Sequence, residues 1–319
     1  MLRDLDGDVV VLGAAGKMGP SLARMARRGL DACERKMLRV IAVSRFSEAG
    51  SRANLEAAGV ETVRCDLTNR EDVAALPEAT NVIFMAGHKF GTTAAPDLTW
   101  IMNTYVPALT AERYHHSRIV AFSTGCVYPN VPVSSGGARE EDALEPDGDY
   151  ANSCVGRERV LTYFSRTNGT PVALFRLNYA IDLRYGVLVD VARKVLAGTP
   201  VDVTMGHANV IWQGDANAQA LQCLAHAASP PFAVNVTGPE TVSIRWLACR
   251  FGELFGREPE IVGTEAETAL LSNASRAHAL FGYPTVVLDT MVQWTAEWLQ
   301  AGGRLLGKPT HFEVRDGRF

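Results

Sequence analysis

Three glycines near the N-terminus have the spacing of a turn that binds a dinucleotide. Gly13, Gly16 and Gly19 form the pattern GxxGxxG in VLGAAGKMGPSLA, between an apolar run and a helical pattern. Glycine permits a tight turn and close backbone approach, and the N-terminus of the following helix offers amide donors to a pyrophosphate. The turn, which also contains Lys17 and Met18, is therefore predicted to bind a dinucleotide. A turn that only packs the helix on the strand is the structural alternative.

The end of the second apolar run should lie beside the adenosine ribose of such a ligand. An Asp or Glu there would hold the 2′-hydroxyl of NAD. This chain instead has Ser44 and Arg45, a hydroxyl and a guanidinium that suit a 2′-phosphate, with Arg52 as a further candidate. These residues predict NADP, with NAD as the alternative. A solvated charge at a strand end is the other interpretation of Arg45.

These candidates need a scaffold that gathers strand ends, and the first half of the chain has the pattern of one. Short β-branched runs alternate with helical patterns, which predicts βαβ units and a parallel sheet. The runs are apolar throughout, as expected when helices cover both faces. We therefore predict an α/β fold, a doubly wound parallel sheet of the Rossmann type, with ligands at the carboxyl ends of its strands. The strand candidates are DVVVLG, LRVIAVS, VETVRC, NVIFMAG, RIVAFST and PVALFRL.

The pattern changes after Leu177, where helical patterns surround one further strand candidate, FAVNVTG at 232–238. The sequence thus predicts a dinucleotide-binding domain over 1–177, to which that strand returns. A smaller interleaved C-terminal lobe, mainly for substrate binding, is predicted over 178–319. The helix candidates of the whole chain are 17–28, 50–58, 69–76, 96–115, 150–167, 186–197, 243–256 and 288–301.

Composition excludes several classes of protein. Apolar residues make up 47% and charged residues 21% of the 319 residues, as in ordinary soluble folds. A formal net charge of −4 gives no general attraction for nucleic acid or an anionic membrane. The six cysteines show no zinc-ligand spacing, and no apolar run reaches the length of a membrane span. We expect a cytoplasmic protein with reduced thiols, no metal, no nucleic-acid or membrane partner, and a small-molecule substrate.

Four stretches lie at strand ends or on the helix that follows. They are the glycine turn, CDLTN after the third strand candidate, STGCVY after the fifth, and YANSCVGRE on the next helix. Together they resemble the extended short-chain dehydrogenase/reductase superfamily, the group of NAD(P)-dependent sugar-nucleotide epimerases and dehydratases. FRLNYA, NVIWQGDANAQAL and VNVTGPETVS are similar to later segments of that family, so the resemblance covers most of the chain.

The resemblance implies further cofactor contacts. Asp66 of CDLTN would accept a hydrogen bond from the adenine amino group, with Leu67 beside it, although an Asp before a helical run is also a common helix cap. Asn103 falls where the family has an asparagine on the helix after the fourth strand. The strand-end residues that would pass beneath the cofactor are Met85, Ala86 and Gly87.

The resemblance also implies a catalytic pair, with one partner missing. Thr124 matches the hydroxyl that binds the substrate oxygen, and Tyr150 matches the acid/base tyrosine. In the family a lysine four residues after the tyrosine contacts the nicotinamide ribose and lowers the pKa of the tyrosine. A free tyrosine titrates near ~10, so without a cation its phenolate is scarce at neutral pH. Here Cys154 occupies that position, and a neutral thiol supplies no charge.

Three explanations for the missing lysine remain open. Arg157 lies seven residues after Tyr150, nearly on the same helix face, and could be a displaced cation, or a solvated arginine. Lys89, in GHKFG after the fourth strand candidate, could reach the pocket from its loop, with His88 as an acid/base or a solvated histidine. In the third explanation, Tyr150 acts only as a hydrogen-bond donor, or the protein has lost redox activity.

Two neighbouring residues narrow the reaction. Sugar-nucleotide 4,6-dehydratases carry an Asp-Glu pair directly after the threonine, because elimination of water needs an acid and a base. Gly125 and Cys126 stand there instead, which argues against such a dehydratase. Thiol chemistry between Cys126 and Cys154 is a weaker interpretation than two structural cysteines.

The sequence therefore predicts an NAD(P)-dependent oxidoreductase or epimerase-like enzyme for a sugar-like or small polar carbonyl or hydroxyl substrate. The rival hypothesis is a dinucleotide-binding sensor or scaffold with weak or no catalysis. The family resemblance also suggests a homodimer. Besides Lys89, the candidate substrate-contacting residues are Asn178, Tyr179, Arg184, Tyr185, His207 and Trp212.

Overall fold

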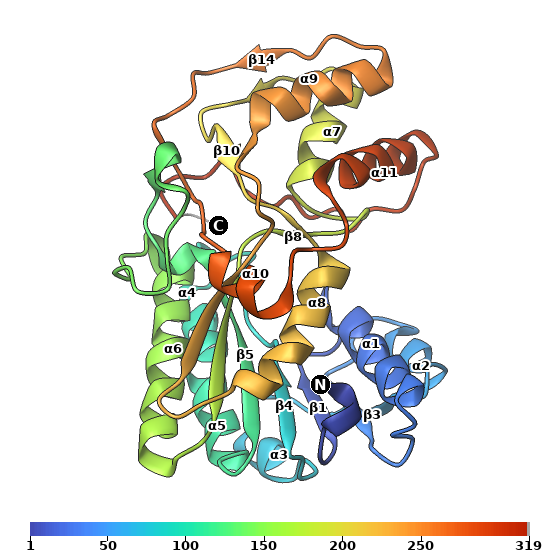
Figure 1. Ribbon diagram of the computed structural model, residues 1–319, viewed down its shortest axis with the longest axis vertical. Coiled ribbons are helices and arrows are strands. Elements are labelled where there is room, and N and C mark those ends of the chain that lie inside the picture. Colours follow the sequence, from blue (N-terminus) through green and yellow to red (C-terminus); the bar gives the residue numbers. More distant parts are fainter. Residues whose placement is uncertain (318–319) are drawn as a thin grey trace.

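A parallel sheet of seven strands forms the centre of the computed structural model, which describes residues 1–317 (Figure 1). The order across the sheet is β12-β7-β5-β4-β1-β2-β3, and every pairing is parallel. The strands are β1 (Val9–Leu12), β2 (Val40–Ser44), β3 (Glu61–Arg64), β4 (Asn81–Phe84), β5 (Arg118–Thr124), β7 (Val172–Leu177) and β12 (Phe232–Val236). The order reverses between β1 and β4, which opens the crevice where such sheets bind ligands. The predicted fold class is confirmed.

Helices cover both faces of the sheet because its strands are apolar on both sides. Val9 and Val11 of β1 face one layer, which includes α1 and α8, whereas Val10 and Leu12 face the other, which includes α5 and α6. The helices around the sheet are α1 (Gly19–Ala32), α2 (Ser51–Glu56), α3 (Arg70–Ala74), α4 (Pro96–Trp100), the π-helical turn η2 (Ile101–Tyr105), α5 (Val106–Arg113), α6 (Gly148–Asn168), α8 (Gln213–Gln222) and α10 (Ser275–Phe281). Every predicted helix and sheet strand is present, with ends shifted by a few residues.

A second hydrophobic core lies beyond the carboxyl ends of the strands, at the top of Figure 1. Helices α7 (Val187–Ala197), α9 (Ile244–Phe255) and α11 (Leu288–Gln300) enclose it. Short strand pairs complete this lobe: β8 (Ala180–Ile181) with β11 (Ile211–Trp212), β9 (Val201–Asp202) with β14 (Ile261–Val262), β10 (His207–Ala208) with β13 (Val242–Ser243), and β6 (Val131–Pro132) with β15 (Thr268–Ala269). The domain division at residue 177 and the substrate role of this lobe stay predictions.

Short 3₁₀ turns connect several of these elements: η1 (Leu2–Asp4), η3 (Gly125–Val127), η4 (Val133–Ser135) and η5 (Cys223–His226). None of the helices within residues 1–317 combines the length and apolar character that crossing a membrane would require.

The segment after α11 returns from the second lobe to the sheet without forming a helix or strand. Its anchors are Thr310 and Phe312, which are 2% and 1% exposed. The backbone N–H and hydroxyl of Thr310 both donate to one carboxylate oxygen of Asp190 on α7, over 2.8 and 2.6 Å. Further on, Gly317 packs against Asp147, directly before α6. We call residues 301–317 the C-terminal segment.

Candidate active site

The glycine turn joins β1 to α1 at the crevice of the sheet. Gly13 has φ +84°, and a Cβ there would lie 2.7 Å from the backbone N of Ala86, so the turn packs tightly on the end of β4. Gly19 packs equally closely on Ala14. Gly16 is exposed, and the nearest described atom to a Cβ there would be the Gly13 carbonyl oxygen at 3.3 Å. The turn is thus closely packed at Gly13 and Gly19 and open to solvent at Gly16, where a pyrophosphate could approach the backbone.

The end of β2 presents the residues predicted to contact the adenosine ribose. Arg45 is exposed and Ser44 half-buried, so both can meet a ligand. Asp66 accepts hydrogen bonds from the backbone N–H and hydroxyl of Thr68, which lower the pKa of its carboxyl, and the charge of Arg45 adds a smaller effect. Arg52 is instead engaged by Glu56, to which its Nε donates over 2.8 Å.

Residues after β3 and β4 form the floor beside the turn. Leu67 and Ala86 are buried and Met85 is half-buried, whereas Gly87 is exposed. A Cβ at Gly87 would lie 2.7 Å from a guanidinium nitrogen of Arg157, so a larger residue here would displace that hydrogen-bonded side chain. The backbone of Gly87 can therefore lie at the surface of the floor while side chains from α6 and η2 fill the space beneath it.

Thr124 and Tyr150 meet at the carboxyl end of β5. Thr124 ends that strand, and its side-chain oxygen caps the turn η3 by accepting from the N–H of Cys126 over 3.1 Å. Tyr150 lies in the first turn of α6, near enough to Thr124 for the Thr124 hydroxyl to influence the pKa of its phenol. Burial raises the pKa of the Tyr150 phenol well above its usual value, and the charge of Arg157 and the Thr124 hydroxyl oppose the rise only in part. The phenol is therefore protonated at neutral pH.

Cys154 lies one turn further along α6 and is fully buried. Burial raises the pKa of its thiol to about 11, although the charge of Arg157 partly counteracts this. At neutral pH the residue is a neutral thiol, which has neither the charge of a lysine nor the nucleophilicity of a thiolate.

Arg157 is 6% exposed, and its guanidinium points beneath the loop after β4. One nitrogen donates to the carbonyl oxygen of Phe122 over 2.5 Å and another to the amide oxygen of Asn103 over 2.6 Å. The group also lies 5.6 Å from the ring centre of Phe84. Arg157 is therefore fixed in the floor of the site. As a surrogate cation it could act on Tyr150 only through its charge, from its place beneath the loop after β4.

Lys89 extends from the loop after β4 over Tyr150. Its Nζ atom lies 5.5 Å from the centre of the Tyr150 ring and donates to the carbonyl oxygen of Thr310 over 3.4 Å. Burial lowers the pKa of the Lys89 amine, and nearby Cys126 and Cys154 act in the opposite direction. The neighbouring His88 is turned away, with its ring nitrogen 3.0 Å from the hydroxyl of Thr99 on α4.

A buried ion pair lies behind the catalytic candidates. Arg176 on β7 makes two hydrogen bonds to Glu158 on α6, over 2.7 and 3.0 Å, and both side chains are at most 6% exposed. Ser123, the residue before Thr124, donates to the same carboxylate over 2.6 Å. Tyr128 accepts from Arg176 over 2.6 Å. Because each charge is paired and hydrogen-bonded, the network can tie β5, α6 and β7 together beneath the site.

The remaining substrate candidates divide into two groups. Asn178 is buried behind Gly125 and donates to the carbonyl of Leu270, and Tyr179, at φ +43°, packs on the second core. Tyr185 lies beneath Lys17, whose Nζ is 4.1 Å from its ring centre. In the second group, Arg184 pairs with Asp182, His207 lies in β10, and Trp212 packs against Trp294.

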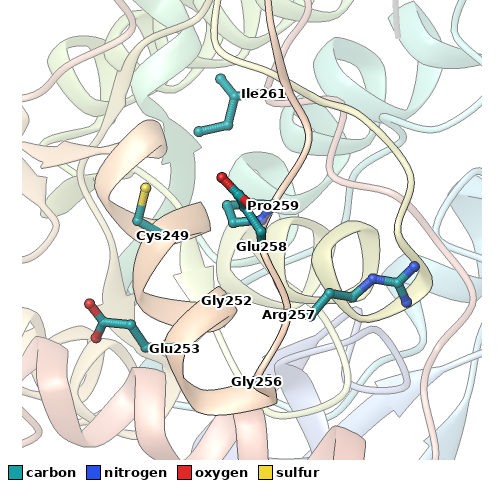
Figure 2. A pocket seen from close by; sticks show the side chains of 8 residues that line it. All are labelled: Cys249, Gly252, Glu253, Gly256, Arg257, Glu258, Pro259 and Ile261. Atoms are coloured by element: carbon teal, nitrogen blue, oxygen red, sulfur yellow. The ribbon is translucent and has the colours of Figure 1, made fainter.

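Two hollows differ in their relation to the site. A cavity of about 30 Å³ lies beside it, lined by residues that include Cys126, Ala151, Val314 and Gly317. A wider hollow of about 490 Å³ lies at the end of α9, around Cys249, Glu253 and Arg257, and contains none of the candidate site residues (Figure 2). Among residues 1–317, no group of three or more His, Cys, Asp and Glu side chains is placed to hold a metal ion.

Sequence reasoning missed several residues that the structure brings to the site. The sequence contains one indication of the buried ion pair, because an arginine such as Arg176 within the apolar strand VALFRL requires a buried partner. The contact of Thr310 with Lys89 had no local signal, because the two residues are 221 positions apart.

Comparison with known proteins assigns the family. The model of the NAD dependent epimerase/dehydratase family matches residues 9–205, which is more than half of the chain. The protein therefore belongs to this family, as the sequence resemblance indicated. None of the curated proteins compared with the chain matches it significantly.

Solved structures show the same fold at low sequence identity. The UDP-glucose 4-epimerase of Thermus thermophilus, solved with NAD, is 22% identical with a TM-score of 0.74. The UDP-glucuronic acid 4-epimerase of Bacillus cereus, also with NAD, is 17% identical with a TM-score of 0.76. MoeE5, in complex with UDP-glucose and NAD, is 19% identical with a TM-score of 0.74. Each alignment covers 92% of this chain and 99% of the other.

Proposed function

We propose that the protein is a nicotinamide-dinucleotide-dependent oxidoreductase or epimerase-like enzyme acting on a sugar-like or small polar carbonyl or hydroxyl substrate. The closeness of Thr124 and Tyr150, at the carboxyl end of the sheet that also presents the glycine turn, carries this proposal. Family membership and the epimerase-like fold support it.

The residues of the site suit proton transfer at a substrate oxygen. A bound dinucleotide supplies the acceptor or donor of a hydride. Tyr150, protonated at neutral pH, can donate its proton to a carbonyl oxygen that becomes a hydroxyl, and Thr124 can orient that oxygen. A positioned acid of this kind typically contributes about 10²–10⁴-fold in rate. Oxidation of a hydroxyl needs the reverse transfer, so the phenol must then lose its proton.

We further propose that NADP is the preferred cofactor. Exposed Arg45 and half-buried Ser44 at the end of β2 support this choice, since a guanidinium and a hydroxyl can hold a 2′-phosphate. The relatives named above were solved with NAD, which remains the alternative.

Binding and turnover test the proposal separately. Calorimetry with NADPH and NADH should show uptake of at least one of them, and absence of both would contradict the proposal. Turnover should then be sought with UDP-sugars, free sugars and small carbonyl compounds, by following reduced nucleotide and by NMR of the sugar. Tyr150→Phe should abolish turnover while leaving nucleotide affinity within about twofold, and Thr124→Val should reduce turnover with a smaller effect.

The buried thiol at Cys154 favours one second candidate, a dinucleotide-binding sensor or scaffold without catalysis. Such a protein needs no ionisable tyrosine. It would bind NADPH or NADH normally, give no turnover with the panel, and show no change in any property when Tyr150 is replaced by Phe.

We also propose a homodimer, in keeping with the family. Large apolar side chains are exposed on neighbouring helices, with Trp100 39% exposed on α4, Tyr105 38% exposed on η2 and Tyr163 64% exposed on α6. Light scattering should give twice the chain mass, and Tyr163→Glu should shift it toward the monomer.

A further inference from the structure

We propose that Lys89, which lies on the loop after β4 and not on α6, is the proton partner of Tyr150. The inference rests on the proposed function and names the group that exchanges a proton with the phenol where the family's lysine is missing. Lys89 acts through Tyr150, so it is a positioning residue and not itself a catalytic residue.

The geometry places the Lys89 amine on the same pocket that a lysine at position 154 would serve. Its Nζ is 5.5 Å from the Tyr150 ring centre, and it interacts electrostatically with Cys154 and Cys126. Arg157, the alternative on α6, has its guanidinium committed to the floor. An arginine also stays protonated in proteins and can donate charge but not exchange a proton, whereas a buried lysine can do both.

The loop that delivers Lys89 is held from below. Asn103 donates to the carbonyl oxygen of His88 and accepts from the His88 N–H, both over 3.0 Å, and Arg157 holds the same amide oxygen. Thr92 donates to the carbonyl oxygen of Lys89 over 2.6 Å. Asn103 lies in the π-helical turn η2, a local irregularity of the kind often found at functional sites. Arg157 thus supports the loop through Asn103.

The C-terminal segment holds the amine from above. Thr310, whose carbonyl oxygen accepts from Lys89, is itself fixed by two hydrogen bonds to Asp190 on α7. The position of the amine therefore depends on hydrogen bonds that connect the loop after β4, through the C-terminal segment, to α7 of the second lobe.

The proton balance is simple. When a substrate hydroxyl is oxidised, its O–H bond breaks and the proton passes to the Tyr150 oxygen, while the phenol proton passes, directly or through one water, to the lone pair of neutral Lys89. In reduction both protons move in the opposite direction. The two-electron change at carbon is that of the proposed hydride reaction. Burial lowers the pKa of the Lys89 amine, which brings its neutral form closer to physiological pH.

Other ionisable groups lie near this amine or contact the residues beside it. From the loops and α6 they are Cys126, Tyr150 and Cys154; from the glycine turn, Lys17; and from the second lobe and C-terminal segment, Asp190, Lys308 and His311. The last two contact the ring of Phe90, the residue after Lys89.

Substitution of Lys89 tests the proposed proton exchange with Tyr150, which we call the relay. Lys89→Met should lower turnover by about 10²–10⁴-fold and remove the limb of the pH profile that follows deprotonation of the amine. Lys89→Arg should not restore turnover, since arginine keeps its proton, and wild-type activity in this variant would overturn the relay. Lys89→Gln serves if the Met variant does not fold. Lys308→Met, which removes an exposed lysine 5.9 Å from Phe90, is the matched control and should leave turnover within about twofold.

A second readout needs neither substrate nor cofactor. The lysines of the chain are Lys17, Lys36, Lys89, Lys194 and Lys308, few enough for assignment of ¹³C-labelled lysine signals by substitution. The Lys89 signal should titrate below the ordinary value of a lysine, and its midpoint should move in Tyr150→Phe. An ordinary lysine midpoint that ignores Tyr150→Phe would overturn the proposal. If the wild type binds no dinucleotide, the proposed function fails, whereas this titration still decides the partnership of Lys89 and Tyr150.

Discussion

Arg157 and Asn103 are joined by a 2.6 Å hydrogen bond beneath Gly87. This bond gives the arginine a structural task in the floor of the site, seven residues after Tyr150. It also changes what a lysine could do at position 154, because that position is fully buried and lies within the electrostatic reach of the guanidinium.

Cys154→Lys should therefore fail to improve turnover. The longer side chain has to enter a filled space beside a buried cation, so we expect the free energy of unfolding to fall by about 1–3 kcal/mol from overpacking alone. Cys154→Ser, of similar size and without charge, is the control. Chemical denaturation and turnover of both variants test this, and increased turnover of the lysine variant at unchanged stability would contradict it.

The glycines of the turn should separate folding from binding. Gly13→Ala places a Cβ at φ +84° and 2.7 Å from the backbone of Ala86, so it should lower the melting temperature markedly. Gly16→Ala meets its nearest described atom at 3.3 Å and should fold nearly normally while weakening dinucleotide affinity. Thermal melting and calorimetry distinguish the two effects. A Gly16→Ala protein with unchanged affinity would place the pyrophosphate elsewhere.

Arg45→Ala should reduce the affinity for NADPH and spare that for NADH. Hydrogen bonds to a charged group contribute about 1.5–3 kcal/mol, which corresponds to about 10- to 100-fold in affinity. Arg52→Ala is a matched control, because Arg52 is paired with Glu56. Equal losses for both nucleotides in Arg45→Ala would remove the argument for NADP.

Lys17 should make stability depend on pH. Its amine donates to the Ala180 carbonyl oxygen over 2.6 Å, and burial lowers its pKa from 10.5 to about 7. Between these values the unfolded chain binds more protons than the folded protein, so this residue makes stability rise with pH. Relative to Lys17→Met, the wild type should therefore gain stability from about pH 7 toward pH 10.5. Denaturation midpoints across this range measure the difference, and a gap that widens in favour of the variant would contradict the burial of the amine.

The sheet and the glycine turn were predictable because they depend on local pattern. Runs such as VVVL and VIAVS have one stable environment, a sheet covered on both faces, and the glycine spacing fits one kind of turn. The site was harder to predict where it depends on contacts between distant segments. Helical spacing put Arg157 on the face of Tyr150, but its commitment to Asn103 and Phe122 follows from packing. Lys89 was one of several open choices, and Thr310 could not be connected to it before the chain was folded.

The return of β12 to the sheet limits how this protein can be recombined with its relatives. Because β12 pairs with β7 only after the chain has passed through α7 and α8, a fragment ending at Leu177 would leave the β7 backbone as a bare edge, open to aggregation. A chimera that takes the second hydrophobic core from a relative therefore needs at least three crossover points, because Phe232–Val236 must stay with its native sheet. A single crossover therefore cannot exchange the second hydrophobic core and leave the seven-stranded sheet intact.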